Sequence, residues 1–211
     1  MKVMSTPYVS IGRTNQKNRT RDALVVAARE LVAAGQTPTV EAAAAAASIS
    51  RTTAYRYFPN QRALLVAAHP ETERASLLPP GISDDPEARI KAVVEAFTLL
   101  IADTDLQQRT MLRLALDPDT PRHEPGLLRQ GRAIAWFEEA LEPLRGRLTD
   151  DELRRLVFAI RSTTGIEARI WLTDVAGLSS DEAIELMRWS AKALFRAALA
   201  DPPTPVTTWT F

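Results

Sequence analysis

The sequence predicts an all-α protein of about nine helices. Apolar residues recur at the helical spacing of three and four residues along most of the 211-residue chain. Residues that favour helix ends, such as Thr, Ser, Asp and Gly, stand where these apolar stripes begin and end. No stretch shows the strict alternation of apolar and polar residues that is typical of a half-buried strand. We therefore expect the core to be built from helices alone.

The first expected helix covers residues 20–34 and is closed by Gly35. Residues 1–18, which precede it, are expected to form a flexible basic arm. The helix carries the i, i+3, i+4, i+7, i+8 stripe of an amphipathic helix. This stripe consists of Leu24, Ala27, Ala28, Leu31 and Val32.

Two short helices around a tight turn follow in the segment TVEAAAAAASISRTTAYRYF, at residues 39–58. Thr39 can cap a first helix through the alanines, and Ser50 can cap a second helix that must end before Pro59. A further helix capped by Asn60 completes the pattern. Residues 19–69 therefore predict a helix-turn-helix domain.

The proline-rich residues 70–85 are expected to connect this domain to a second helical domain at residues 86–200. Five helices are expected there. The sequence Asp85-Pro86 and two capping boxes, which begin at Thr149 and Ser179, mark helix starts.

Two further boundaries are expected in the second domain. Pro143 should end or kink a helix that covers residues 126–144. The capping box at Thr149 should open one long helix to Val175. Residues 201–211 are expected to form a tail.

The charges of the chain are unevenly divided, although the formal net charge is zero. Residues 1–70 hold nine Lys/Arg and three Asp/Glu, a net charge of +6. The remaining 17 basic and 23 acidic residues therefore give −6. A basic first domain on an acidic body is typical of a protein whose first domain meets phosphates. Chance asymmetry of a solvated surface is the alternative.

The second motif helix carries the candidate nucleic-acid contacts, because a helix-turn-helix presents this helix to the major groove. Arg51 and Arg56 supply positive charge for the phosphate backbone. Thr52 and Thr53 can reach a base edge or a phosphate from the first turn, and local capping is their alternative role.

Two tyrosines and an arginine extend this set of candidates. Tyr55 and Tyr57 each offer a hydroxyl to phosphate, and a core position is the alternative for one of them. Arg19 in the N-terminal region could bind the backbone or enter the minor groove, and a solvated basic terminus is its alternative.

The segment SRTTAYRYFPNQRAL at residues 50–64 resembles the DNA-binding region of the tetracycline-repressor (TetR) family of bacterial regulators. The resemblance is specific over residues 19–69 and architectural beyond them. It implies DNA contacts at both tyrosines. Gln61 stands where the family commonly places a Lys near phosphate, and Ser48 stands at the turn position usually held by Gly. With Thr39, Gln61 completes the candidate DNA-binding residues.

The resemblance implies a ligand-responsive homodimer that binds a pseudo-palindromic operator on double-stranded DNA, as a repressor released by a small molecule. The alternative is an all-helical small-molecule binding or scaffold protein of the same fold without DNA binding.

The family uses a cavity in the second domain for its ligand. Candidate lining residues are mostly apolar and come from different helices, and an ordinary core position is the alternative for each apolar one. A charged residue within an apolar run needs a partner or a function. The candidates are Phe97, Met111, Trp136, Phe158, Arg161 and Trp171.

The last two long helices carry more apolar surface than one monomer is expected to need. Two helices from each of two subunits could form a four-helix interface, the arrangement that the resemblance implies. A monomeric core is the alternative. The candidate interface residues are Leu153, Val157, Ile170, Ile184, Met187, Ala191, Leu194 and Phe195.

No catalytic motif is recognisable, so an enzyme is not expected, and no cofactor is expected either. Asp117, Asp119, His123 and Glu124 crowd one loop and could in principle bind a metal, but such acidic residues more often cap helices or solvate loops. The absence of cysteine excludes disulfides. No apolar run has the length of a membrane span or a signal-peptide core, so we expect the cytoplasm as the location and no membrane partner.

Overall fold

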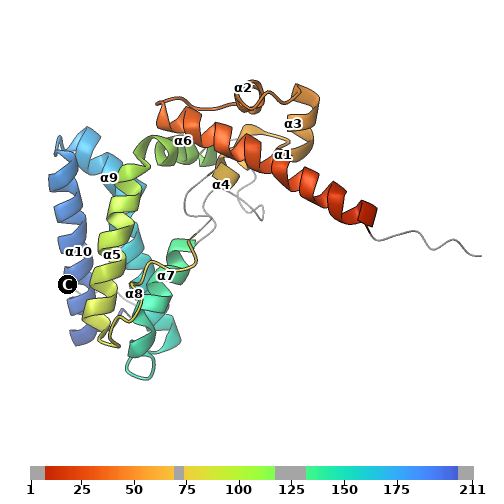
Figure 1. Cartoon of the computed structure of the whole chain (residues 1–211). Helices are drawn as coiled ribbons and strands as arrows, with labels where there is room; N and C mark the ends of the chain where they lie inside the picture. Colours follow the sequence, from red (N-terminus) through yellow and green to blue (C-terminus); the bar gives the residue numbers. More distant parts are fainter. Residues whose placement is uncertain (1–7, 69–73, 117–131, 204–211) are drawn as a thin grey trace, which may run out of the picture. The chain divides into compact units, whose positions relative to one another are not determined.

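The regular secondary structure of the described residues is helical, apart from one isolated bridge between Arg145 and Leu148. The computed structural model describes residues 8–68, 74–116 and 132–203 (Figure 1). The predicted all-α class is confirmed for these ranges.

The chain divides into two compact units. The first, which we call the head unit, contains Met1–Glu73 and Thr110–Leu128. The second, the body unit, contains Arg74–Arg109 and Arg129–Phe211. Helix α6, Asp105–Ala115, starts in the body unit and ends in the head unit.

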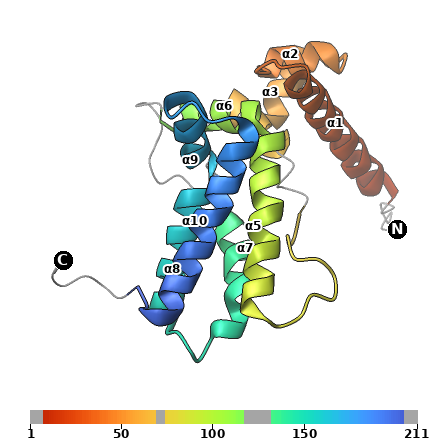
Figure 2. The same ribbon diagram turned by 90° about the vertical axis from the view of Figure 1, so that its left-hand side faces the viewer.

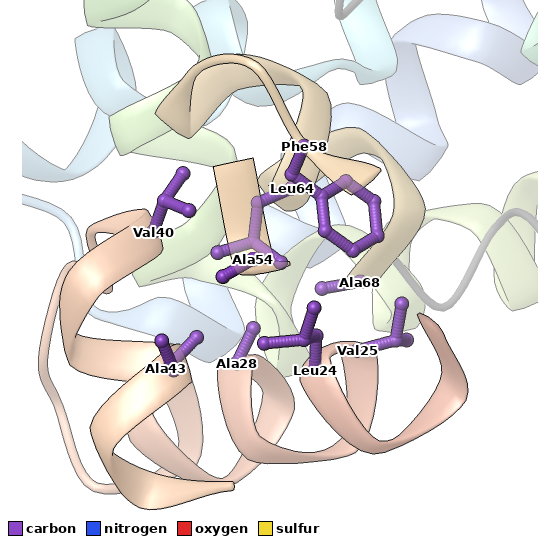
Figure 3. Close-up of a cluster of buried hydrophobic side chains, with 10 residues drawn as sticks. Leu24, Val25, Ala28, Val40, Ala43, Ala54, Phe58, Leu64 and Ala68 are labelled. Carbon is purple, nitrogen blue, oxygen red and sulfur yellow. The ribbon is translucent and has the colours of Figure 1, made fainter. Parts of the chain in front are cut away.

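The head unit contains four helices before residue 69: α1 (Tyr8–Ala33), α2 (Val40–Ala46), α3 (Arg51–Tyr57) and α4 (Gln61–Ala68). Helix α1 packs against each of the other three, and α2 packs against α3. Figure 3 shows side chains from all four helices converging on one small core.

This core is rich in alanine, and its largest side chain is Phe58, which is 3% exposed and directly follows α3. Apart from Phe58, the core is built from small and aliphatic side chains. These are Leu24, Val25, Ala28, Val40, Ala43, Ala44, Ala54, Leu64 and Ala68.

Helix α1 begins at Tyr8, well before the predicted start at residue 20, so residues 8–18 are helical and do not form a flexible arm. Residues 16–19 are exposed, so this part of the helix carries no buried stripe that would announce it in the sequence. The Thr20 hydroxyl donates to the carbonyl of Gln16, which is a bond of the helix to its own preceding turn.

The body unit is organised around α5 (Pro86–Asp103), α7 (Arg132–Leu141), α8 (Asp150–Thr164) and α10 (Ser180–Ala200). Helix α10 packs against α5 and α8, and α7 packs against the same two helices. Figure 2 shows α10 flanked by α5 and α8. These helices therefore close a ring around a shared core.

The predicted caps of the body unit are present. The Asp85 carboxylate accepts from the backbone at the start of α5, and Thr149 and Ser179 form complete capping boxes with Glu152 and Glu182. At Pro143, α7 gives way to a short 3-10 turn, Glu142–Leu144, as the sequence predicts.

The predicted helix from Thr149 to Val175 is interrupted, and the expectation of one continuous helix is wrong. Gly165 has an extended backbone and separates α8 from α9, Ile166–Ile170. A π-helix, Trp171–Val175, then follows. A Cβ at Gly165 would overlap the Arg161 guanidinium, which crosses the junction to Glu167 at 3.5 Å. The break therefore depends on a contact that helical periodicity cannot reveal.

Candidate nucleic-acid interface

Helices α2 and α3 are two short helices joined by a tight turn, and each cap lies where the sequence predicts it. The Thr39 hydroxyl accepts from the Ala42 backbone at 3.1 Å, and the Ser50 hydroxyl accepts from the Thr53 backbone at 3.3 Å. Between the helices Ser48 adopts φ +55°, the left-handed region that favours glycine. A serine therefore makes the tight turn at some conformational cost.

The exposed side chains of α3 include Arg51, Thr52 and Arg56. Arg51 is 73% exposed, and Arg56 lies over the ring of Tyr57 at 5.6 Å from its centroid. These three residues place positive charge and a hydroxyl on one short helix. Such groups contact phosphates and base edges in nucleic-acid complexes.

Tyr55 is tied to an acidic residue that the sequence prediction omitted. Its hydroxyl donates to Glu41 on α2 at 2.5 Å, and Arg51 makes an ion pair with the same carboxylate at 3.0 Å. The bond from Tyr55 holds the pKa of the Glu41 carboxyl below its ordinary value, and the same bond raises the pKa of Tyr55. Glu41 is thus a charged carboxylate at neutral pH, beside two of the predicted DNA contacts.

Thr53 and Tyr57 are less accessible than the exposed group. The Thr53 hydroxyl accepts from the Ser50 hydroxyl at 2.8 Å, so it takes part in the cap of α3. Tyr57 is half-buried and packs against the head core. Both contacts agree with the alternatives of capping and core packing for these positions.

The remaining candidates lie on three other elements of the head unit. Thr39 is exposed as the cap of α2, and Arg19 is exposed on α1. Gln61, the first residue of α4, donates its side-chain amide to the carbonyl of Pro38 at 2.9 Å. The head thus places Gln61 against the loop before α2, where its amide joins α4 to the start of the motif.

The predicted ligand-pocket residues of the body unit differ in their exposure. Phe97 is buried against Trp136, with ring centroids 6.4 Å apart, and Arg161 lies over the Phe97 ring at 5.3 Å. Phe158 and Trp171 are instead 43% and 58% exposed. Phe158 lies outside the buried stripe of α8, and Trp171 is the first residue of the π-helix. Met111 belongs to the head unit.

Most of the predicted dimer-interface residues lie in the core of the body unit within a single subunit. Six of the eight residues are at most 7% exposed, because the apolar stripes of α8 and α10 face the other helices of the same ring. Ile170 and Leu194 alone among the eight retain partial exposure. The six buried residues are Leu153, Val157, Ile184, Met187, Ala191 and Phe195.

The loop with Asp117, Asp119, His123 and Glu124 lies outside the described residues, as does most of the predicted tail. Among the described residues no group of three or more His, Cys, Asp or Glu side chains is placed to hold a metal ion. Over the same ranges no helix is long and apolar enough to cross a membrane.

Comparison with protein-family models, with curated proteins and with solved structures gives no match for this chain.

Proposed function

We propose that this protein is a cytoplasmic, homodimeric transcriptional regulator of the TetR type that binds double-stranded operator DNA through its head unit. A small molecule bound by the body unit would release it, which makes it a repressor. The observation that carries the proposal is the exposed set Arg51, Thr52 and Arg56 on a helix held by a capped tight turn. In helix-turn-helix proteins this helix enters the major groove.

Binding to DNA should be strongly salt-dependent. The Arg51, Arg56 and Arg19 side chains give about three phosphate contacts per subunit, or about six per dimer, and each contributes a slope of about −0.9 in log K against log salt. Affinity should then fall about a thousandfold between 50 and 200 mM salt. Fluorescence anisotropy with the gene's own upstream DNA and with a random duplex measures both affinity and slope.

Two variants sharpen this measurement. Arg56→Ala should weaken binding to both duplexes and make the slope shallower, whereas Arg147→Ala, which removes an exposed arginine of the body unit, serves as the matched control. A salt slope near zero for the unmodified protein would count against a DNA-binding head.

The alternative function is a small-molecule binding or scaffold protein that does not bind DNA. The observation in its favour is the Glu41 carboxylate, which accepts a hydrogen bond from Tyr55 and makes an ion pair with Arg51. A carboxylate at this place repels phosphate and holds back two groups that would otherwise meet it. The effect of Glu41 on DNA binding therefore distinguishes the hypothesis of a DNA-binding regulator from that of a scaffold protein.

Replacing Glu41 by Gln should tighten binding to any duplex by about fivefold, because an exposed ion pair and its repulsion are worth on the order of 1 kcal/mol. The amide can still accept the Tyr55 hydrogen bond, so the fold of the head should persist. Arg51 should then meet its phosphate without competition from the carboxylate, and the salt slope should stay close to that of the unmodified protein, because the number of phosphate contacts is unchanged.

The matched control is Glu30→Gln, which removes the same charge from an exposed position of α1. If Glu41→Gln weakens binding, the carboxylate holds Arg51 and Tyr55 in the conformation that binds DNA. If neither variant binds DNA at all, the result favours the alternative function of a small-molecule binding or scaffold protein.

The proposed dimer uses the outer faces of α8 and α10, which pack on each other within one subunit. The large apolar side chains exposed on these two helices include Phe158 on α8, at 43%, and Leu186 on α10, at 39%. Exposed apolar groups on two adjoining helices favour burial against a second copy.

Phe158→Asp and Leu186→Asp should each shift the protein from dimer to monomer at least tenfold, since each places a charge in an apolar interface. Sedimentation equilibrium measures the dissociation constant. Leu99→Asp on α5, an exposed leucine at 48%, is the control that should leave the dimer intact. A wild-type protein that sediments as a monomer would contradict the proposed assembly.

A further inference from the structure

The body unit has an apolar groove between α5 and α10 that the proposed function does not use. This α5–α10 groove encloses about 200 Å³. Its floor includes Ile90, Val94 and Phe195, all at most 4% exposed, and one wall is the indole of Trp189, which is 66% exposed. A largely exposed tryptophan beside a buried apolar floor is a surface that a ligand can cover.

The charged side chains around the groove are mostly engaged with each other. Glu87 makes an ion pair with Arg196 at 3.0 Å, and Lys91 lies 3.9 Å from Glu95. Arg188 donates to the hydroxyl of Thr98 and to the carbonyl of Glu95. Each of these charged side chains therefore already has an interaction partner within the body unit.

Lys192 is the exception. It lines the groove from α10 and is exposed, and within the described residues it makes no hydrogen bond or ion pair. The groove-lining residues carry three cations and two carboxylates, and one of the carboxylates is neutralised by Arg196, which lies outside the lining. The surplus charge at the groove is therefore positive.

From this geometry we infer that the α5–α10 groove binds a small amphipathic organic anion. The apolar body lies on Ile90, Val94 and Phe195 and is covered by Trp189, while the anionic group pairs with Lys192. The volume is below the roughly 300–1,000 Å³ of sites for drug-sized ligands, so the apolar body is a short alkyl chain or a single ring. The inference is independent of whether the head binds DNA.

Octanoate is a suitable probe, because it joins one carboxylate to a short alkyl chain. The chain contains four tryptophans. A Trp171→Phe/Trp209→Phe background leaves the buried Trp136 and the groove residue Trp189 as emitters. Octanoate should then give a saturable blue shift of the emission, because the alkyl chain removes water from the Trp189 indole. Octan-1-ol, which lacks the charge, should bind about fivefold more weakly.

The charge requirement is tested on the full chain by calorimetry. Lys192→Glu should weaken octanoate binding about tenfold, since it removes an attractive charge and adds a repulsive one. Arg113→Glu makes the same charge change at an exposed position of the head unit and should leave the affinity unchanged. The proposal is overturned if octanoate does not saturate, if octan-1-ol binds equally well, or if the two charge variants behave alike.

Discussion

Replacing Asp105 by Ala should lower the free energy of unfolding of the body unit by about 3 kcal/mol. The Asp105 carboxylate accepts from Arg109 at 2.6 Å and from Arg169 at 2.9 Å. The Arg169 side chain is only 9% exposed, and its Nη1 makes no hydrogen bond among the described residues. Without Asp105 the Arg169 guanidinium loses its ion pair and keeps its hydrogen bond to the Ser180 hydroxyl, so a buried charge is left poorly compensated.

Urea denaturation followed by circular dichroism measures this loss. Asp103→Ala, an exposed acid at the end of α5, is the matched control and should cost less than 0.5 kcal/mol. In an Asp105→Leu/Arg169→Met double variant the cost should shrink, because both charges leave the interior together. If the single and double variants are equally destabilised, the pair with Arg169 is not the source of the effect.

The same group of charges makes the stability of the body unit depend on pH in the acid range. Two bonds from Arg109, with the hydroxyl of Thr173 beside them, lower the pKa of Asp174 from its ordinary 3.8 to about 2. Because the folded pKa is the lower one, this pair stabilises the fold above about pH 4 and the contribution is lost as the pH falls toward 2. Asp174→Asn should therefore flatten the stability profile over that range.

Helix ends were predictable because their signals are local. Thr39 and Ser50 cap α2 and α3, and Thr149 and Ser179 open α8 and α10, with hydroxyls bonded to backbone groups three residues away. A cap needs only the neighbouring sequence, so the residue pattern contains the whole interaction. The exposure of Arg56 was likewise predictable from helical spacing.

Long-range contacts were not predictable in the same way. The break at Gly165 depends on the path of Arg161 across the junction, and the bond of Tyr55 to Glu41 joins two helices. Neither contact leaves a periodic trace in the sequence. The residues of a dimer interface are not predictable from spacing for a related reason, because an apolar stripe such as that of Val157 has the same spacing whether it faces its own subunit or another.

Replacing Phe58 by Ala should destabilise the head unit by about 3–5 kcal/mol, which is a large fraction of the stability of a small domain. Phe58 is 3% exposed and lies at the centre of contacts from α1, α3 and α4 (Figure 3). The neighbouring side chains include Ala28, Ala54 and Ala68, which are too short to fill the resulting cavity. The Arg21 guanidinium, 5.5 Å from the ring centroid, also loses its aromatic partner.

The expected result is an unfolded head on a folded body. Hydrogen exchange should therefore accelerate in α1–α4 of the Phe58→Ala protein while the amides of α5, α8 and α10 stay protected. DNA binding should be lost together with the head, whereas octanoate binding should persist, since every residue of the α5–α10 groove belongs to the body unit. Val26→Ala on α1, where the side chain is 51% exposed, is the control and should change neither property. Uniform loss of protection in both units would mean that they unfold as one, and that the small alanine-rich core of the head does not set its stability alone.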